Sequence, residues 1–294
     1  MPVPTSTLPA RDAVARLSAA WRELGRGPAL VVTGAGISLA SGISTFRGSD
    51  PDAIWKASDV ELATVDYFHR DPVGQWRWYL ERFLRLDGAA PNPAHEAVAD
   101  LERLHVEAGG EMTVVTQNID LLHERAGSRR LIKIHGSSDR VRCSRTGCTH
   151  GAPQGSLPRD EARLETFAEA PSIETLPRCP DCRAPLRAHV LFFDEYYQDH
   201  ADYRFAKAMA AAERAELVLF AGTSFSVGIT DLIGRAARHR RVPVYSIDPN
   251  PAPRAHTYGV RTLAAPAEEL LPAVVADLLG SDEARGRDVS GEKS

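Results

Sequence analysis

The chain has 294 residues, a formal net charge of −4 and an apolar fraction of 43%, which allow one large domain or a large and a small one. The balance of charge provides no overall positive field, so we expect neither nucleic acid nor an anionic membrane as a partner. No stretch is apolar for long enough to cross a bilayer, and the first residues lack the pattern of a signal peptide, so we expect a cytoplasmic protein.

Strand-like and helix-like patterns alternate along the chain. Val14, Leu17, Trp21 and Leu24 repeat at helical spacing, and Gly25 ends that helix. Short apolar runs predict strands at 29–33, 112–116, 131–134, 216–221, 242–247 and 260–264, with helices at 202–215, 229–240 and 267–279. Such alternation predicts an α/β fold, a Rossmann-like parallel sheet with helices on both faces.

Two segments interrupt this alternation. Residues 48–111 contain helical patterns and aromatic residues, and residues 137–189 contain all four cysteines. We expect these inserts to form a smaller domain beside a discontinuous Rossmann-like domain made of residues 11–47, 112–136 and 190–280, with flexible tails at 1–10 and 281–294. Because ligands of open α/β sheets bind beyond the carboxyl ends of the strands, we expect the site in a cleft between the two domains.

A glycine-rich turn follows the first expected strand, in the sequence Gly34-Ala35-Gly36-Ile37-Ser38. Glycine has no Cβ, so backbone amides at such a turn can approach a phosphate closely. The common dinucleotide fingerprint requires a third glycine where this chain has Leu39. The missing glycine weakens the interpretation as a hydride-transferring dehydrogenase.

The cysteines form two pairs, Cys143 with Cys148 and Cys179 with Cys182. Two such pairs can give a tetrahedral all-thiolate zinc site, although four unrelated thiols are the alternative. Four thiolates close the coordination sphere, so we expect one structural zinc ion rather than a catalytic one. Zinc binding can supply on the order of 10 kcal/mol of folding free energy to a loop-rich insert.

Polar residues stand where three expected strands end. Gln117, Asn118 and Asp120 follow the strand at 112–116, and His135 follows the strand at 131–134. Functional side chains gather at such positions in α/β folds, but a lone histidine is more often structural, and an asparagine or aspartate there can cap the next helix. Gly222-Thr223-Ser224 ends a third strand; for Ser224, a helix cap is as reasonable as a ligand contact.

Asp248 ends the strand at 242–247. A carboxylate at a strand end can accept both hydroxyls of an adenosine ribose and would repel a 2′-phosphate, which favours NAD over NADP.

The motifs at 34–38, 44–48, 117–120 and 134–136 together resemble the sirtuins, the NAD-consuming lysine deacylases, and the resemblance runs from about Ala29 to about Leu279. It implies that His135 is the general base, working near its unperturbed pKa on a ribose hydroxyl, while Asn118 and Asp120 hold the nicotinamide ribose. The NAD contacts it implies are Gly34, Ala35, Gly36, Ser38, Thr45, Phe46, Arg47, Gln117, Asn118, Asp120, Gly222, Thr223, Ser224 and Asp248. Sirtuins commonly have asparagine at the position of Asp248.

The resemblance also bears on the acyl group. Tyr79 and Arg82 precede the run Pro91-Asn92-Pro93-Ala94-His95, as in class III sirtuins, which remove succinyl and malonyl groups, and Thr45 agrees with that subgroup. An arginine fork can bind a terminal carboxylate through two hydrogen bonds. The ordinary alternative is a half-buried tyrosine and a solvated arginine.

Residues 189–195 resemble the segment where sirtuins pair with the substrate backbone, which implies substrate contacts at Val190, Phe192 and Phe193. An edge strand packed on the zinc module is the alternative. Asp194 stands where the family usually has glycine, and aspartate tolerates a positive φ less well.

The implied partner is an acylated lysine in a protein or peptide, acted on by a monomer. In this chemistry the acyl oxygen attacks the anomeric carbon of the ribose, and His135 then activates the ribose hydroxyl that attacks the resulting imidate. The products are nicotinamide, free lysine and O-acyl-ADP-ribose. The alternatives are an NAD hydrolase or mono-ADP-ribosyltransferase on the same scaffold, and a non-catalytic NAD or ADP-ribose sensor that binds a partner protein.

Overall fold

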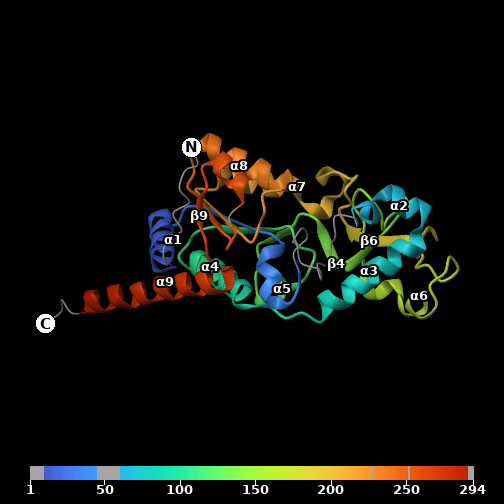
Figure 1. Cartoon of the computed structure of the whole chain (residues 1–294), viewed down its shortest axis with the longest axis horizontal. Helices are drawn as coiled ribbons and strands as arrows, with labels where there is room; N and C mark the ends of the chain where they lie inside the picture. Colours follow the sequence, from blue (N-terminus) through green and yellow to red (C-terminus); the bar gives the residue numbers. More distant parts are fainter. Residues whose placement is uncertain (1–9, 45–59, 227, 251, 291–294) are drawn as a thin grey trace.

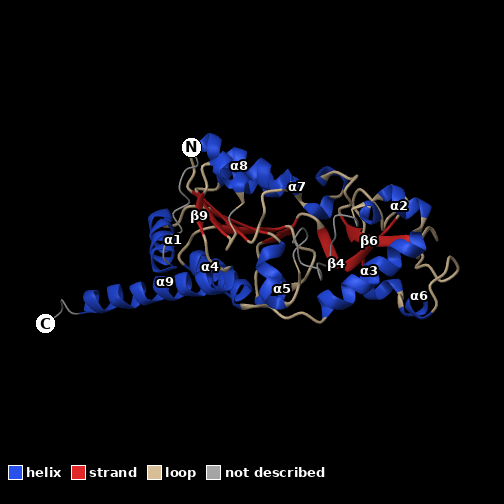
Figure 2. Ribbon diagram, viewed as in Figure 1, coloured by secondary structure: helices blue, strands red, loops and turns tan. Residues whose placement is uncertain are grey.

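The computed structural model describes residues 10–44, 60–226, 228–250 and 252–290. Its larger part is a six-stranded parallel sheet with the strand order β3-β2-β1-β7-β8-β9, drawn in red in Figure 2. The strands are β1 (Ala29–Thr33), β2 (Met112–Thr116), β3 (Leu131–Lys133), β7 (Leu217–Ala221), β8 (Val244–Ile247) and β9 (Arg261–Leu263). The predicted α/β fold with a parallel sheet is confirmed.

Helices cover both faces of this sheet, which explains the continuous apolar runs of its strands. Along β1, Ala29 and Val31 point into the core beneath α1 (Ala10–Leu24), α4 (Pro93–Glu107) and α9 (Ala267–Ser290). Leu30 and Val32 point into the opposite core, beneath α7 (Phe205–Arg214) and α8 (Gly228–Arg240). Figure 1 shows the two helical layers on either side of the sheet.

Two helices depart from the expected organisation. Helix α4 lies within residues 48–111, expected in the smaller domain, but Ala97, Val98 and Leu101 bury its apolar face in the core of the large sheet. Helix α9 continues to Ser290, whereas we expected a flexible tail from residue 281. One glycine and two serines among residues 281–290 lower helix propensity, but no proline interrupts them, and a helix already nucleated by packed residues extends readily. Figure 1 shows this end of α9 projecting past the sheet.

A second, smaller module lies at the opposite end of the molecule from the free end of α9 (Figures 1 and 2). Its antiparallel sheet has the order β5-β4-β6, formed by β4 (Gly136–Cys143), β5 (Leu157–Pro158) and β6 (Leu186–Val190). Helices α2 (Val65–Arg70), α3 (Pro72–Asp87) and α6 (Glu165–Glu169) pack there around Trp76, Phe83 and Phe167. The exact domain boundaries given above remain a prediction.

The connections of the large sheet mark one position for a ligand. From β1 the chain continues to β2 on one side and reaches β7 on the other side only later. Open α/β sheets bind ligands at such a switch in strand order, beyond the carboxyl ends of the strands. The turns after Thr33 and Ala221 meet at this point.

Among the residues that the structure describes, no helix has both the length and the apolar character needed to cross a membrane.

Candidate active site

The turns after β1 and β7 touch each other through their backbones. The Gly36 N–H donates a hydrogen bond of 2.8 Å to the carbonyl oxygen of Gly222. A Cβ at Gly36 would lie 2.7 Å from the Gly222 Cα, and a Cβ at Gly34 would lie 2.8 Å from the Gly222 oxygen. These glycines therefore allow two loops to approach one another, and the Gly36 amide is already engaged. Gly36 lies in the first turn of the short helix η1 (Ala35–Ser41), for which Gly34 is the N-cap residue.

Asn118, Ser38 and Asp120 form a buried hydrogen-bonded chain beside these turns. The Asn118 side-chain amide donates to Ser38 Oγ (3.1 Å), and Ser38 Oγ donates to Asp120 Oδ2 (3.1 Å). Asp120 Oδ1 also accepts the Leu122 N–H at the start of α5 (Leu122–Ala126), so Asp120 both caps a helix and belongs to the site. Burial raises the pKa of Asp120, although the hydrogen bond from the Leu122 N–H and the positive charge of Lys133 lower it in part.

His135 lies between β3 and β4, where the large sheet passes into the small one. Its Nδ1 lies 2.8 Å from the carbonyl oxygen of Gln117, an acceptor, so Nδ1 carries the proton and Nε2 keeps its lone pair. Burial lowers the pKa of His135 to about 4, and the bond to Gln117 only partly opposes this. The expectation of a base near its unperturbed pKa was wrong, because desolvation of the imidazolium dominates. At neutral pH the ring is a neutral proton acceptor.

Gln117 connects three strand ends. Its side-chain amide donates to the Thr33 carbonyl oxygen and to Thr223 Oγ1, both at 3.2 Å, while its own carbonyl oxygen holds His135. The ends of β1, β2 and β7 are therefore locked together around one amide side chain.

The other expected cofactor residues lie nearer the surface or outside the described chain. Ser224 is exposed and bonds to Ser226 Oγ (2.7 Å), four residues before α8 begins. Asp248 directly follows β8 and accepts the Asn250 N–H (2.8 Å), and burial raises its pKa. Three expected NAD contacts, Thr45, Phe46 and Arg47, lie outside the described residues.

The segment expected to bind the substrate backbone is joined directly to His135. Val190 pairs with Gly136 in the antiparallel sheet, and the Leu191 N–H donates to the His135 carbonyl oxygen (2.9 Å). Phe192 is buried, with 1% of its surface exposed. The residue that holds the imidazole and the segment expected to hold the substrate thus share one short piece of sheet.

Asp194 has a structural function that explains its presence in place of glycine. Its carboxylate accepts the Val65 N–H (2.8 Å) and the Asp66 N–H (3.2 Å) at the start of α2. The neighbouring Phe193 N–H donates to the Ala63 carbonyl oxygen (3.0 Å), and the Phe193 side chain is 46% exposed. Asp194 is not among the described residues with a positive φ, so no backbone strain arises there.

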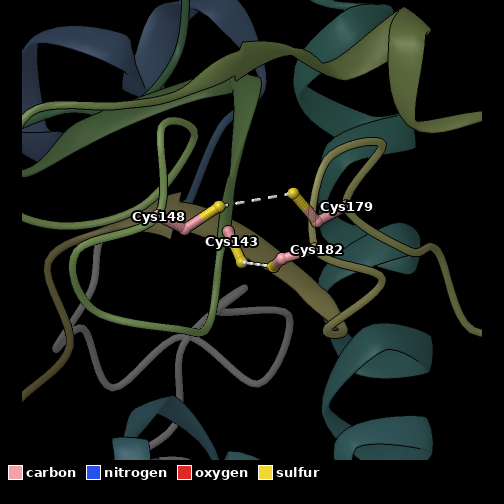
Figure 3. A group of neighbouring side chains, drawn as sticks. All are labelled: Cys143, Cys148, Cys179 and Cys182. Carbon is pink, nitrogen blue, oxygen red and sulfur yellow. Dashed lines mark hydrogen bonds between the residues drawn. The ribbon is translucent and has the colours of Figure 1, made fainter.

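The four cysteines converge from the end of β4, which carries Cys143, and from two loops, with their sulfur atoms turned toward one another (Figure 3). The Cys143 and Cys182 sulfurs lie 3.4 Å apart, and those of Cys148 and Cys179 lie 3.7 Å apart. All four lie within 4.8 Å of one another, and a tetrahedral zinc ion with Zn–S bonds of about 2.3 Å requires separations of about 3.8 Å. The four thiols are positioned to bind one structural zinc ion, as predicted.

Comparison with known proteins agrees with this geometry. The Sir2 family model matches residues 34–228, which carry the turns, His135 and the cysteines. The chain belongs to the Sir2 family.

Two relatives and one structure illustrate the similarity. An NAD-dependent protein deacylase of Thermus thermophilus is 38% identical over 224 residues, covering 76% of this chain and 80% of that protein. NAD-dependent protein deacylase 1 of Archaeoglobus fulgidus is 38% identical over 226 residues, covering 76% and 82%. A crystal structure of a Sir2 homologue in complex with NAD is 33% identical with a TM-score of 0.73, covering 91% of this chain and 94% of that one.

In this Sir2 chain, Tyr79 and Arg82 are placed by α3. Tyr79 is 1% exposed and stacks on Phe192 (ring centroids 5.9 Å apart) and against Phe83 (5.5 Å). Arg82 lays its guanidinium over Trp78, 3.8 Å from the ring centroid, and donates to the Trp78 carbonyl oxygen. Tyr79 is therefore in direct contact with the expected substrate segment.

Sequence reasoning missed a buried polar layer beneath the Sir2 site. His123 Nε2 bonds to Thr33 Oγ1 (2.9 Å), which donates to Thr116 Oγ1 (2.9 Å). His95 lies 3.4 Å from Ser38 Oγ, and its ring packs against His123 with centroids 4.9 Å apart. Burial lowers the pKa of both histidines, so they are neutral. The only sequence signal was a single threonine ending each of two apolar strands.

Proposed function

We propose that this chain removes acyl groups from lysine side chains of proteins in a reaction that consumes NAD and yields nicotinamide, lysine and O-acyl-ADP-ribose. The observation that carries the proposal is the neutral His135 ring, with its Nε2 lone pair available at the switch point and its backbone joined to residues 190–192. Relatives named NAD-dependent protein deacylases support the same activity.

Each strand-end residue has a proposed part in this reaction. NAD supplies a ribose whose anomeric carbon accepts the acyl oxygen. His135 Nε2 accepts the proton of a ribose hydroxyl, and Asn118 and Asp120, fixed through Ser38, orient the nicotinamide riboside. Further NAD contacts are proposed along the turns after the strands, at Gly34, Ala35, Gly36, Thr45, Phe46, Arg47, Gln117, Gly222, Thr223, Ser224 and Asp248.

Nicotinamide release tests this function. We expect the purified chain to release nicotinamide from NAD only when an acyl-lysine peptide is present. The nicotinamide and the deacylated peptide should form in equal amounts. Release without a peptide would instead support an NAD hydrolase, and binding of NAD without turnover would support a sensor. The sharing of one strand pair by His135 and the substrate segment favours the deacylase.

The pH dependence follows from the lowered pKa of His135. A base with a pKa of about 4 stays neutral from pH 8 down to pH 5, so we expect kcat/KM to remain within about twofold over this range. Activity should fall only as the pH approaches the pKa. A loss of half of kcat/KM near pH 6.5, the ordinary histidine pKa, would contradict this assignment.

For the acyl group we propose a preference for succinyl and malonyl over acetyl. The stacking of Tyr79 on Phe192 supports it, because this contact brings α3, which also carries Arg82, to the substrate segment. Two charge-assisted hydrogen bonds from Arg82 would bind the terminal carboxylate of such an acyl group.

The preference is tested by Arg82→Met. We expect kcat/KM for a succinyl-lysine peptide to fall by roughly 10- to 100-fold, the size of a lost charge-assisted hydrogen bond, with less than a threefold change for the acetyl peptide. Arg85→Met is the matched control, since Arg85 lies on the same helix, is exposed and pairs with Glu81. Equal losses for both peptides would remove the proposed preference without touching the deacylase assignment.

A further inference from the structure

Tyr197 lies against the ring of His135. It begins the short helix η5 (Tyr197–Asp199), two residues after the end of the expected substrate segment at 189–195. Its ring is nearly parallel to the His135 ring (14°, centroids 5.9 Å apart) and stacks on Phe205 on its other side (6°, 5.3 Å). Its hydroxyl lies 3.5 Å from His135 Nε2, the nitrogen with the free lone pair.

The hydrogen bonds around the hydroxyl decide the direction of its proton. Ile229, at the start of α8, donates its N–H to the Tyr197 oxygen (3.2 Å), one of the helix-terminal amides that lack a partner within the helix. The oxygen is thus an acceptor for Ile229, and its own proton is available for His135 Nε2. Burial raises the pKa of Tyr197, so the phenol keeps this proton at neutral pH.

We propose that Tyr197 is a positioning residue that orients the His135 imidazole for its work as a base. The inference rests on the proposed function. Nδ1 is held by Gln117 and Nε2 by the Tyr197 hydroxyl, so the two contacts together fix the ring plane. Because Nε2 has a single lone pair, the ribose hydroxyl takes the place of the Tyr197 hydroxyl at Nε2 in catalysis and gives it its proton, while Tyr197 keeps its own. The Tyr197 contact thus orients the ring before the ribose hydroxyl arrives.

Tyr197 also joins the base to two other parts of the site. It follows the substrate segment in the chain, and its hydroxyl caps α8, the helix that begins after the β7 turn at Gly222-Thr223-Ser224. A displacement of either part would therefore move the Tyr197 hydroxyl relative to His135.

The test is Tyr197→Phe, which removes the hydroxyl and keeps the ring that stacks on Phe205. In the proposed reaction His135 acts after nicotinamide has left, so exchange of labelled nicotinamide into NAD reverses the earlier step and does not need the base. We expect kcat for deacylation to fall roughly 5- to 10-fold, the size of one hydrogen bond, while peptide-dependent exchange and the KM for NAD stay within twofold. Tyr196→Phe is the control, because Tyr196 is 73% exposed, and it should change neither rate.

Equal losses of exchange and deacylation would indicate general damage and overturn the proposal, as would an unchanged deacylation rate. A second measurement does not depend on activity. In the ¹⁵N spectrum of the histidine rings, Tyr197→Phe should move the Nε2 resonance of His135 and leave its Nδ1 resonance in place. An unchanged Nε2 resonance would also overturn the proposal. If the wild-type chain releases no nicotinamide with any acyl peptide, the proposed function fails, and this spectrum still tests the contact.

Discussion

Replacing His135 with alanine is expected to reduce deacylation of an acyl-lysine peptide by about 10²- to 10⁴-fold, the usual contribution of a positioned general base. The change removes the only part of His135 that performs chemistry. Its backbone bond to Leu191 and the pairing of Gly136 with Val190 remain. The measurement is the rate of O-acyl-ADP-ribose formation, followed by mass spectrometry.

Two comparisons make this result specific. Peptide-dependent nicotinamide exchange should survive in His135→Ala, because the base acts only after the glycosidic bond is broken. His239→Ala, an exposed histidine on α8, should match the wild-type chain in both assays. Deacylation by His135→Ala at the wild-type rate would end the assignment of this ring as the base, whatever NAD does in the site.

The large sheet could be predicted because strands that are buried on both faces must be apolar along their length. The runs at 29–32 and 217–221 are apolar at every position because both faces of β1 and β7 are buried, and this pattern can be recognised within a single segment. The two cysteine pairs could also be recognised in the sequence, because the spacing within each pair is short. Only the approach of one pair to the other depends on the tertiary fold.

The rest of the site depends on contacts between distant segments, which leave no local signal. Thr33, Thr116 and His123 are unremarkable polar residues until the fold brings them within hydrogen-bond distance. The sequence allowed Asp194 to be judged only by the φ angles that aspartate tolerates, whereas its carboxylate caps a helix that begins at Val65, 129 residues earlier. The pKa of His135 depends on burial by all these segments, so spacing alone gave only its ordinary value.

Replacing Cys179 with alanine is expected to destabilise the small module more than any surface change, because a structural zinc site can contribute on the order of 10 kcal/mol of folding free energy. Cys179 is fully buried, and the bound ion would tie Cys143, at the end of β4, to the loop before β6. We expect zinc content to fall from about one ion per chain to less than a tenth, measured by mass spectrometry of the metal, with a matching fall in Tm.

We expect Cys179→Ala to destabilise only the small module and yet to abolish deacylation. Hydrogen exchange should accelerate in β4 and β6 and remain slow in β1 and β7, whose two cores contain none of the cysteines. Ile173→Ala, an exposed change in the same insert, is the control and should keep its zinc and its Tm. The cysteines belong to the core of the small module, but β4 connects Cys143 to Gly136, the residue after His135. The Leu191 N–H, just after β6, also holds the His135 backbone. Loosening β4 and β6 in Cys179→Ala should therefore displace His135 and abolish deacylation. A Cys179→Ala protein that retains its zinc and its Tm would show that the four thiols do not form the metal site.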